Sequence, residues 1–315
     1  MLENFLFVVN AVLPVFLLIG LGLVLKKTKL INDSFTKCAS SITFKIALPA
    51  VLFKNMLDAD FSALFNPKLV GLCIAIPFVI TALVWGVGAR FIRDKAKLAS
   101  FAHGSFRINF AILSLPICIN LFGDIGAQVG GLLLAVTIPV YNVLAVILLS
   151  VLCSGSEKIR PLKIALDVIK NPFIIAAALG AVMKFMPFGL PLFLDNALNY
   201  VTDLAIPLAL ITIGGSFDFS RCRSAFPLSM TASVIKTVIT PLVFVPIGAL
   251  MGLAGYELGI LMVYCAAPAA VTSYIMSAGM GGDPDIASNI VLYSTFMSGI
   301  MILLGIFLLK TIGIV

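Results

Sequence analysis

Polar side chains interrupt an apolar stretch of this chain that also contains a proline. The segment "FRINFAILSLPICIN" spans positions 106–120, where Arg107 and Asn109 precede Pro116 and Asn120 follows it. The guanidinium group of an arginine is a planar fork of N–H donors that fits a carboxylate, and an asparagine offers both a donor and an acceptor. These residue types predict a binding site for an organic anion.

A second apolar stretch repeats this combination. In "YCAAPAAVTSYIMSAG", positions 264–279, Pro268 is followed by the hydroxyl side chains of Thr272 and Ser273. A proline removes a backbone donor and frees carbonyl groups, which in lipid need partners inside the protein or in a water-filled cavity. We expect two broken helices that cross near the membrane midplane, with a simple kink at each proline as the alternative. Half-helix N-termini at such a crossing attract an anion.

Polar groups near the two prolines complete the predicted site. Tyr141 and Asn142 follow Pro139 in the next apolar stretch. The predicted substrate-binding residues are Arg107, Asn109, Pro116, Asn120, Tyr141, Asn142, Pro268, Thr272 and Ser273. Arg107 lies about 13 Å into its helix. Its guanidinium group therefore either grips the anion, guides it from the cytoplasmic side, or snorkels to the interface.

Three further charges fall inside apolar stretches, namely Lys45, Asp203 and Lys236. Lys45 precedes Pro49 by the same distance as Asp203 precedes Pro207, so we predict that these two side chains pair. Such a pair is either structural or responsive to protons. Lys236 either attracts the anion or caps freed carbonyl groups. With Arg107, the intramembrane cations outnumber the anion, which favours an anionic substrate.

The composition indicates that these residues act inside a membrane. Hydrophobic residues make up 61% of the 315-residue chain and charged residues 11%, against about 25% charged in soluble domains. The net charge of +7 comes without a basic tract that would indicate a nucleic-acid partner. The single histidine, His103, cannot build a multi-histidine metal site, the six cysteines form no CxxC pair, and neither HExxH nor GxSxG occurs. We therefore expect no enzyme, no metal and no cofactor.

Ten apolar windows are long enough to cross a bilayer. They are residues 4–26, 34–56, 68–92, 98–121, 127–151, 165–186, 191–216, 227–252, 258–279 and 286–310. Lysine and arginine collect in alternate connections, which places both termini outside the cytoplasm. The prediction is an all-α polytopic membrane protein that is integral to the lipid bilayer.

The two halves of the chain show weak internal similarity. Pro14 matches Pro172, and Pro49 matches Pro207 at the same offset. Because each half has an odd number of spans, the second half must enter the membrane in the opposite orientation. We therefore divide the chain into inverted five-helix repeats at residues 1–151 and 165–315, in which helices four and nine are the broken, crossing helices. This architecture is typical of secondary transporters.

Several segments together resemble the auxin efflux carrier family, specifically its bacterial malonate and malate permease-like members. The resemblance covers the whole chain. It rests on "FRINFAILSLPI", "PVYNVLAVILL", "IKNPFIIAAALG", "AIPLALITIGGSF", "KTVITPLV" and "AAPAAVTSYIMSAGMGGD". The long cytoplasmic loop of many plant members is missing, so loop-based regulation is not expected.

The resemblance implies a scaffold of helices one, two, six and seven and a moving transport domain of helices three to five and eight to ten. It also implies a homodimer in a bacterial inner membrane, where the outside location predicted for both termini is the periplasm. The expected function is alternating-access, elevator-like transport of a small organic anion, such as malonate, malate or an auxin-like acid. A ligand-sensing transceptor or an anion channel on the same scaffold is the alternative. Coupling to Na+ or to H+ remains open.

Overall fold

A computed structural model describes residues 2–58, 66–153, 172–186, 189–216 and 226–315. The described residues fold into helices without strands. Five helical stretches among them are long and apolar enough to cross a membrane: Pro67–Phe91, Lys95–Cys153, Leu192–Gly215, Phe226–Leu250 and Pro284–Thr311. The ten-span count stays a prediction. The predicted span 165–186 and the basic connections at 158–170 and 221–223 lie partly or wholly outside the described residues.

The helices follow the apolar windows of the sequence. The first half of the chain contains α1 (Leu2–Lys27), α2 (Asp33–Ile42), η1 (Thr43–Ala47), α3 (Leu48–Asp58), α5 (Pro67–Phe91), α6 (Lys95–Phe106), η2 (Phe110–Ser114) and α7 (Leu115–Cys153). The second half contains α9 (Pro172–Lys184), α10 (Leu192–Ser216), α11 (Phe226–Val234), η4 (Ile235–Ile239), α12 (Thr240–Leu250), α13 (Tyr256–Ala266), α14 (Val271–Gly279) and α15 (Pro284–Thr311). The η elements are single π-helical turns.

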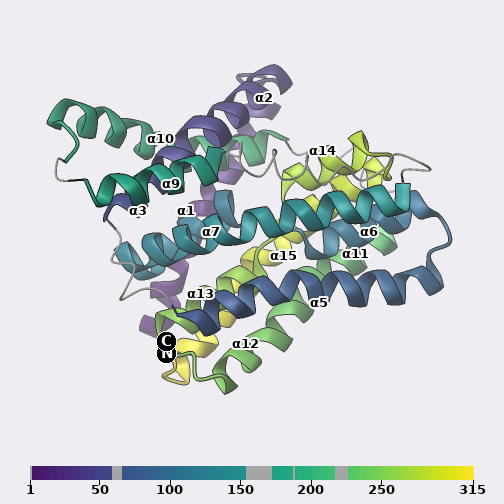
Figure 1. Cartoon of the computed structure of the whole chain (residues 1–315). Helices are drawn as coiled ribbons and strands as arrows, with labels where there is room; N and C mark the ends of the chain where they lie inside the picture. Colours follow the sequence, from purple (N-terminus) through teal and green to yellow (C-terminus); the bar gives the residue numbers. More distant parts are fainter. Residues whose placement is uncertain (1, 59–65, 154–171, 187–188, 217–225) are drawn as a thin grey trace.

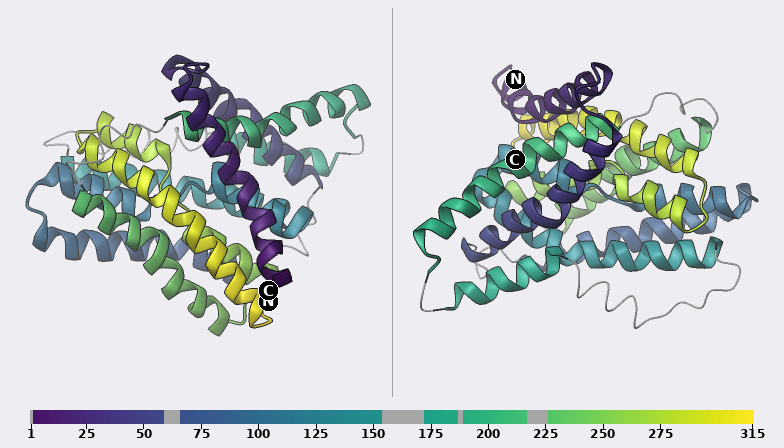
Figure 2. Two further views of the ribbon diagram at one scale, coloured as in Figure 1. Left: turned by 180° about the vertical axis from the view of Figure 1, so that it is seen from behind. Right: turned by 90° about the horizontal axis from the view of Figure 1, so that it is seen from above.

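Helices α1, α2, α3, α9 and α10 pack together on one side of the molecule (Figure 1). Helices α5, α6, α7 and α11 to α15 form the other side and contribute most of the buried core. Figure 2 shows α1 crossing the outside of the molecule beside α15, and the two chain ends at the same end of the fold. The polar residues predicted to bind substrate lie on helices of this second, larger group or in the connections between them.

The π-helical turns η1, η2 and η4 each end two residues before a proline. The prolines concerned are Pro49 after η1, Pro116 after η2 and Pro241 after η4. A proline cannot donate to the preceding turn, and its ring clashes with the carbonyl four residues earlier. A wider turn relieves that clash while the helix continues. These three prolines are therefore absorbed without unwinding the chain.

Capping residues fix where the spans begin. Asn66, Asp94 and Asp283 accept hydrogen bonds from backbone N–H groups in the first turns of α5, α6 and α15. Such side chains satisfy donors that a helix start leaves free. Within α7, Gly123 adopts φ 59° and ψ −135°, a conformation that residues with a side chain rarely adopt. This kink separates the two windows predicted at 98–121 and 127–151.

Candidate functional site

Two interrupted helices meet at the centre of the larger helix group. Helix α6 ends at Phe106 and the chain is extended at Arg107, with φ −61° and ψ 137°. Helix α13 ends at Ala266, and four non-helical residues, 267–270, precede α14. The backbone N–H of Asn109 donates to the carbonyl oxygen of Pro268 at 2.7 Å, so the two breaks contact each other directly.

The backbone of the second break is held by side chains as well. The N–H of Ala269 donates to the hydroxyl of Ser294 on α15 at 3.0 Å. The hydroxyl of buried Ser273 donates to the carbonyl of Ala270 at 2.6 Å. Backbone groups released from a helix inside a membrane protein need such partners. The hydroxyl group of Ser273 therefore stabilises the break by donating to this carbonyl. From the sequence we expected this hydroxyl group to donate to the substrate instead.

The first break lies at residues 107–109, and the prediction that placed it at Pro116 was wrong. Pro116 is the second residue of α7 and follows the π-helical turn η2. That turn accommodates the missing donor, so the helix remains intact around Pro116. Pro268, by contrast, lies inside the second break.

Arg107 is the charged group at this crossing. Its side chain is 7% exposed, and its Nη2 donates to Oδ1 of Asn142 at 2.7 Å and to the hydroxyl of Thr272 at 3.5 Å. Its Nη1 is buried and has no hydrogen-bond partner in the described part of the chain. The guanidinium is therefore held inside the protein instead of snorkelling to an interface. Nη2 is engaged by Asn142 and Thr272, whereas Nη1 has donor capacity that no described residue uses.

Three helices position the groups around Arg107. Arg107 comes from the end of α6, Asn142 from α7 and Thr272 from the first turn of α14. Asn109 is buried next to the break, where its backbone N–H makes the bond to Pro268. Asn120 does not belong to this buried group, because it is exposed on α7 near the Gly123 kink.

An aromatic cluster packs against Phe106, the residue that precedes Arg107. The ring of Tyr141 stacks on Phe106, with 6.1 Å between centroids and 7° between planes. The hydroxyl of Tyr141 lies 3.0 Å from that of Tyr264, which donates to the carbonyl of Cys73 at 2.9 Å. Tyr141 is therefore a support for the residue preceding Arg107. Sequence reasoning missed Tyr264, which precedes Pro268 by one helical turn.

Lys236 caps a backbone carbonyl near the second break. It is 2% exposed within η4, and its Nζ donates to the carbonyl oxygen of Cys265 at 3.0 Å. Cys265 belongs to the last turn of α13, where carbonyl groups lose their helical partners. Of the two roles considered for this lysine, the structure favours capping.

Lys45 and Asp203 do not form the predicted ion pair. Both side chains are exposed, and the ion pairs of the described residues do not include them. Instead, Lys54 on α3 pairs with Asp195 on α10 at 3.1 Å and also hydrogen-bonds to Asn199. Equal spacing before a proline predicts that the two charges lie at similar depths in the membrane. It does not predict the helix faces on which they lie.

A polar seam runs from the arginine along α6. Ser100 and His103 lie about one turn apart on α6, Arg107 follows at the end of the helix, and all three are buried. Nδ1 of His103 lies 3.2 Å from the hydroxyl of Ser277 on α14. Nε2 of His103 and the hydroxyl of Ser100 are without partners among the described residues. The spacing of residues 100, 103 and 107 is visible in the sequence. However, His103 was considered there only as a metal ligand.

The fold and the site define an all-helical membrane protein in which two broken helices cross beside the buried, positively charged side chain of Arg107. The chain belongs to the family described as "Membrane transport protein", whose profile matches residues 7–306. This confirms the resemblance to the auxin efflux carriers. Family membership and the names of its relatives indicate a transporter.

The relatives cover most of the chain at low identity. An "Uncharacterized transporter" of Methanothermobacter thermautotrophicus is 22% identical over 291 residues, 92% of this chain and 94% of the relative. One of Methanocaldococcus jannaschii is 24% identical over 311 residues, 96% of this chain and 99% of the relative. A "Putative malonate transporter" of Rhizobium meliloti is 24% identical over 216 residues, 66% of each chain.

Proposed function

We propose that this protein is a secondary transporter that carries a small organic anion across the membrane by alternating access. The observation that carries the proposal is the buried Nη1 of Arg107, which has no partner in the described structure and lies where two broken helices cross. A carboxylate matches the geometry of a guanidinium fork, to which it can accept two parallel hydrogen bonds. The name of the Rhizobium relative supports malonate, with malate and auxin-like acids as further candidates.

Ten spans in two inverted repeats, residues 1–151 and 165–315, are the architecture that we propose for this carrier. The proposed repeat mates α5 and α12 run antiparallel, because Lys68 at the start of α5 donates to the carbonyl of Met251 at the end of α12. The chain ends also lie at the same end of the fold, as an even number of crossings requires (Figure 2). Both features support opposite orientations of the two halves.

The movement that we propose is elevator-like. The scaffold would consist of helices one, two, six and seven, which correspond to α1, α2 with α3, α9 and α10. The helices around the crossing would move as the transport domain. Packing of α1 on α10 and of α3 on α9 supports this division. We further propose that the scaffold forms a homodimer.

Orientation follows from the distribution of lysine and arginine. We propose a bacterial inner-membrane location with both termini periplasmic. A reporter that is active only in the cytoplasm should be silent at the C-terminus and active when fused near position 156. The opposite pattern would overturn this orientation.

Uptake by reconstituted vesicles tests the function. Labelled malonate, malate and indole-3-acetate are offered while Na+, H+ and voltage gradients are imposed separately. A carrier accumulates at least one acid and shows counterflow after preloading, and the gradient that drives uptake identifies Na+ or H+ coupling. A flux that does not saturate as the substrate concentration rises would identify a channel instead. Binding without flux would identify a transceptor. Equal transport of the neutral amides would overturn the anion site.

A further inference from the structure

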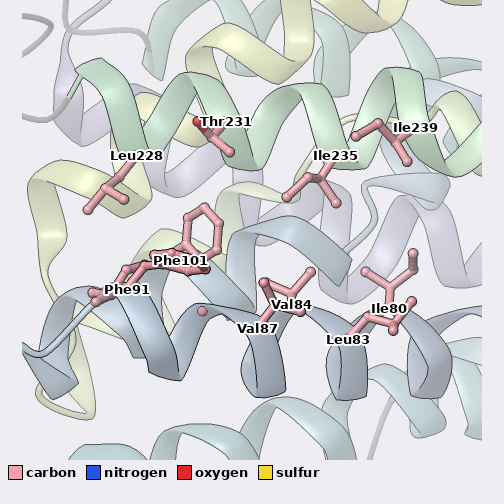
Figure 3. A pocket seen from close by; sticks show the side chains of 12 residues that line it. Ile80, Leu83, Val84, Val87, Phe91, Phe101, Leu228, Thr231, Ile235 and Ile239 are labelled. Carbon is pink, nitrogen blue, oxygen red and sulfur yellow. The ribbon is translucent and has the colours of Figure 1, made fainter.

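An apolar groove opens between α5 and the α11–η4 segment, away from the crossing (Figure 3). It encloses about 440 Å³ and is lined by twelve residues, of which Thr231 alone carries a polar side-chain atom. Ile80 faces Ile239 at one end, and Phe91 faces Leu228 at the other. The two walls therefore run antiparallel, and nothing in the lining could orient a polar solute except the one hydroxyl group.

The groove is open along one side to the surroundings of the protein. Its floor is buried, with Ile80 and Val84 each 6% exposed. Its rim is exposed, with Leu83 at 57%, Val87 at 56% and Phe91 at 80%. In a membrane-spanning helix, such apolar exposure faces lipid, so hydrocarbon chains have direct access to the groove.

The length of the groove matches one leaflet of a bilayer. From Ile80 to Phe91 the helix rises about 16 Å at 1.5 Å per residue. Half of a hydrocarbon core is about 15 Å thick. Because Pro67–Phe91 is the whole span, the groove occupies the half that ends at Phe91.

Positive charge marks that end of the groove. Arg90 and Arg93 flank the lining residues Phe91 and Ile92, and both arginines are exposed. Guanidinium groups bind phosphate oxygens in a bidentate manner, and basic residues at a membrane surface attract anionic headgroups. The charged end thus lies where a lipid headgroup would lie, and the apolar groove lies where its acyl chain would lie.

We propose that the groove between α5 and α11–η4 is a binding site for one anionic phospholipid, with its phosphate on Arg90 and Arg93 and an acyl chain along Ile80–Phe91. A second copy of the chain fits this surface less well. A two-fold axis along the membrane normal would bring the same arginines of both copies to the same face, where like charges repel. This site is independent of the proposed transport activity.

The test uses the purified full-length protein in detergent and native mass spectrometry with added phosphatidylglycerol or phosphatidylcholine. We expect one phosphatidylglycerol to bind more tightly than phosphatidylcholine. A basic residue near an anionic headgroup contributes a factor of about five, so the R90Q/R93Q double variant should weaken binding on the order of 30-fold. Thr231→Trp, which fills the groove from its rim, should prevent binding of the acyl chain while leaving both arginines in place.

A matched control separates this site from general attraction to basic surfaces. The K29Q/K37Q variant removes the same charge from exposed lysines outside the groove-lining elements and should bind phosphatidylglycerol like the wild type. Size-exclusion profiles and melting temperatures verify that all variants are folded. Equal binding of both lipids, equal losses in the arginine and lysine variants, or unchanged binding in Thr231→Trp would each overturn the proposal. A change of oligomeric state in Thr231→Trp would identify a protein partner instead.

Discussion

The backbone N–H of Asn109 donates to the carbonyl of Pro268 at 2.7 Å, which joins the two broken helices across 159 positions of sequence (268 − 109). One break supplies the donor and the other the acceptor, so each relieves an unsatisfied backbone group of the other. The contact fixes Arg107, two residues before Asn109, beside Thr272, four residues after Pro268. A charged side chain is thereby held at the crossing by the main chain of both halves.

The first prediction concerns the fork of Arg107. Arg107→Lys keeps the charge but replaces the planar fork, in which Nη2 binds Asn142 and Nη1 has no partner, with a single ammonium nitrogen that cannot reproduce this geometry. Losing a hydrogen bond between the fork and the charged substrate should weaken binding by about 2 kcal/mol, roughly 30-fold. Initial rates of uptake in vesicles, measured over a range of substrate concentrations, test this. Arg93→Lys is the control, because Arg93 is exposed and the same substitution is made there. If Arg107→Lys transports normally, the arginine guides the anion and does not grip it.

The second prediction introduces a competing carboxylate. Oδ1 of Asn142 accepts from Nη2 of Arg107 at 2.7 Å, so Asn142→Asp places a negative charge at that distance with almost no change in volume. The new carboxylate should neutralise the guanidinium and reduce anion affinity by about tenfold or more. Binding is measured by protection against thermal unfolding with added malonate. Asn142→Ser, which is neutral, should lose less. Equal affinities in wild type and Asn142→Asp would contradict an anion site at Arg107.

The third prediction concerns the cap on the second break. Lys236→Met retains the length of the side chain but leaves the carbonyl of Cys265 without its donor. A buried acceptor without a partner costs about 1–3 kcal/mol. The melting temperature in detergent should fall, and Lys45→Met, at an exposed lysine in another π-helical turn, should leave it nearly unchanged. If Lys236→Met preserves stability but abolishes transport, the lysine acts on the substrate and not as a cap.

The fourth prediction concerns the crossing of α1 and α10. A Cβ atom at Gly22 would overlap the carbonyl oxygen of Ile211, and one at Gly214 would overlap that of Ile19. Small residues allow membrane helices to approach closely. Gly22→Ala should therefore destabilise the protein by about 1–3 kcal/mol. Gly20→Ala, where nothing lies within 4 Å, is the matched control. Equal melting temperatures of the two variants would show that α1 can shift without cost.

The sequence allowed Arg107, Asn142 and Thr272 to be predicted as one site, and these residues do gather. Charge and amide groups in apolar segments stand out because burial is costly unless they have partners. The position of the first break could not be predicted from Pro116. A proline in the sequence shows only that one backbone N–H donor is missing. A π-helical turn can accommodate the missing hydrogen bond without breaking the helix. Whether a helix breaks or widens depends on the groups that tertiary packing supplies.

The charge pair illustrates a second limit. Lys45 and Asp203 were predicted to meet because both lie at similar depths before their prolines. Depth is one coordinate, and the face of the helix is another that changes by about 100° per residue. Packing of α10 against η1 leaves both side chains on outer surfaces. Lys54 and Asp195 lie on facing surfaces, but no repeat offset pointed to them.

The last prediction separates these two pairs. Lys54→Met and Asp195→Asn should each destabilise the protein, and the double variant should lose less than the sum, because each single change leaves the same ion pair broken. Both side chains are partly exposed, so the coupling should be about 0.2–1 kcal/mol. Melting temperatures of the four proteins measure it. The same cycle on Lys45→Met and Asp203→Asn should be additive, since these charges do not contact each other. Coupling in the second cycle and additivity in the first would mean that the functional protein pairs the charges as their spacing before the prolines suggests.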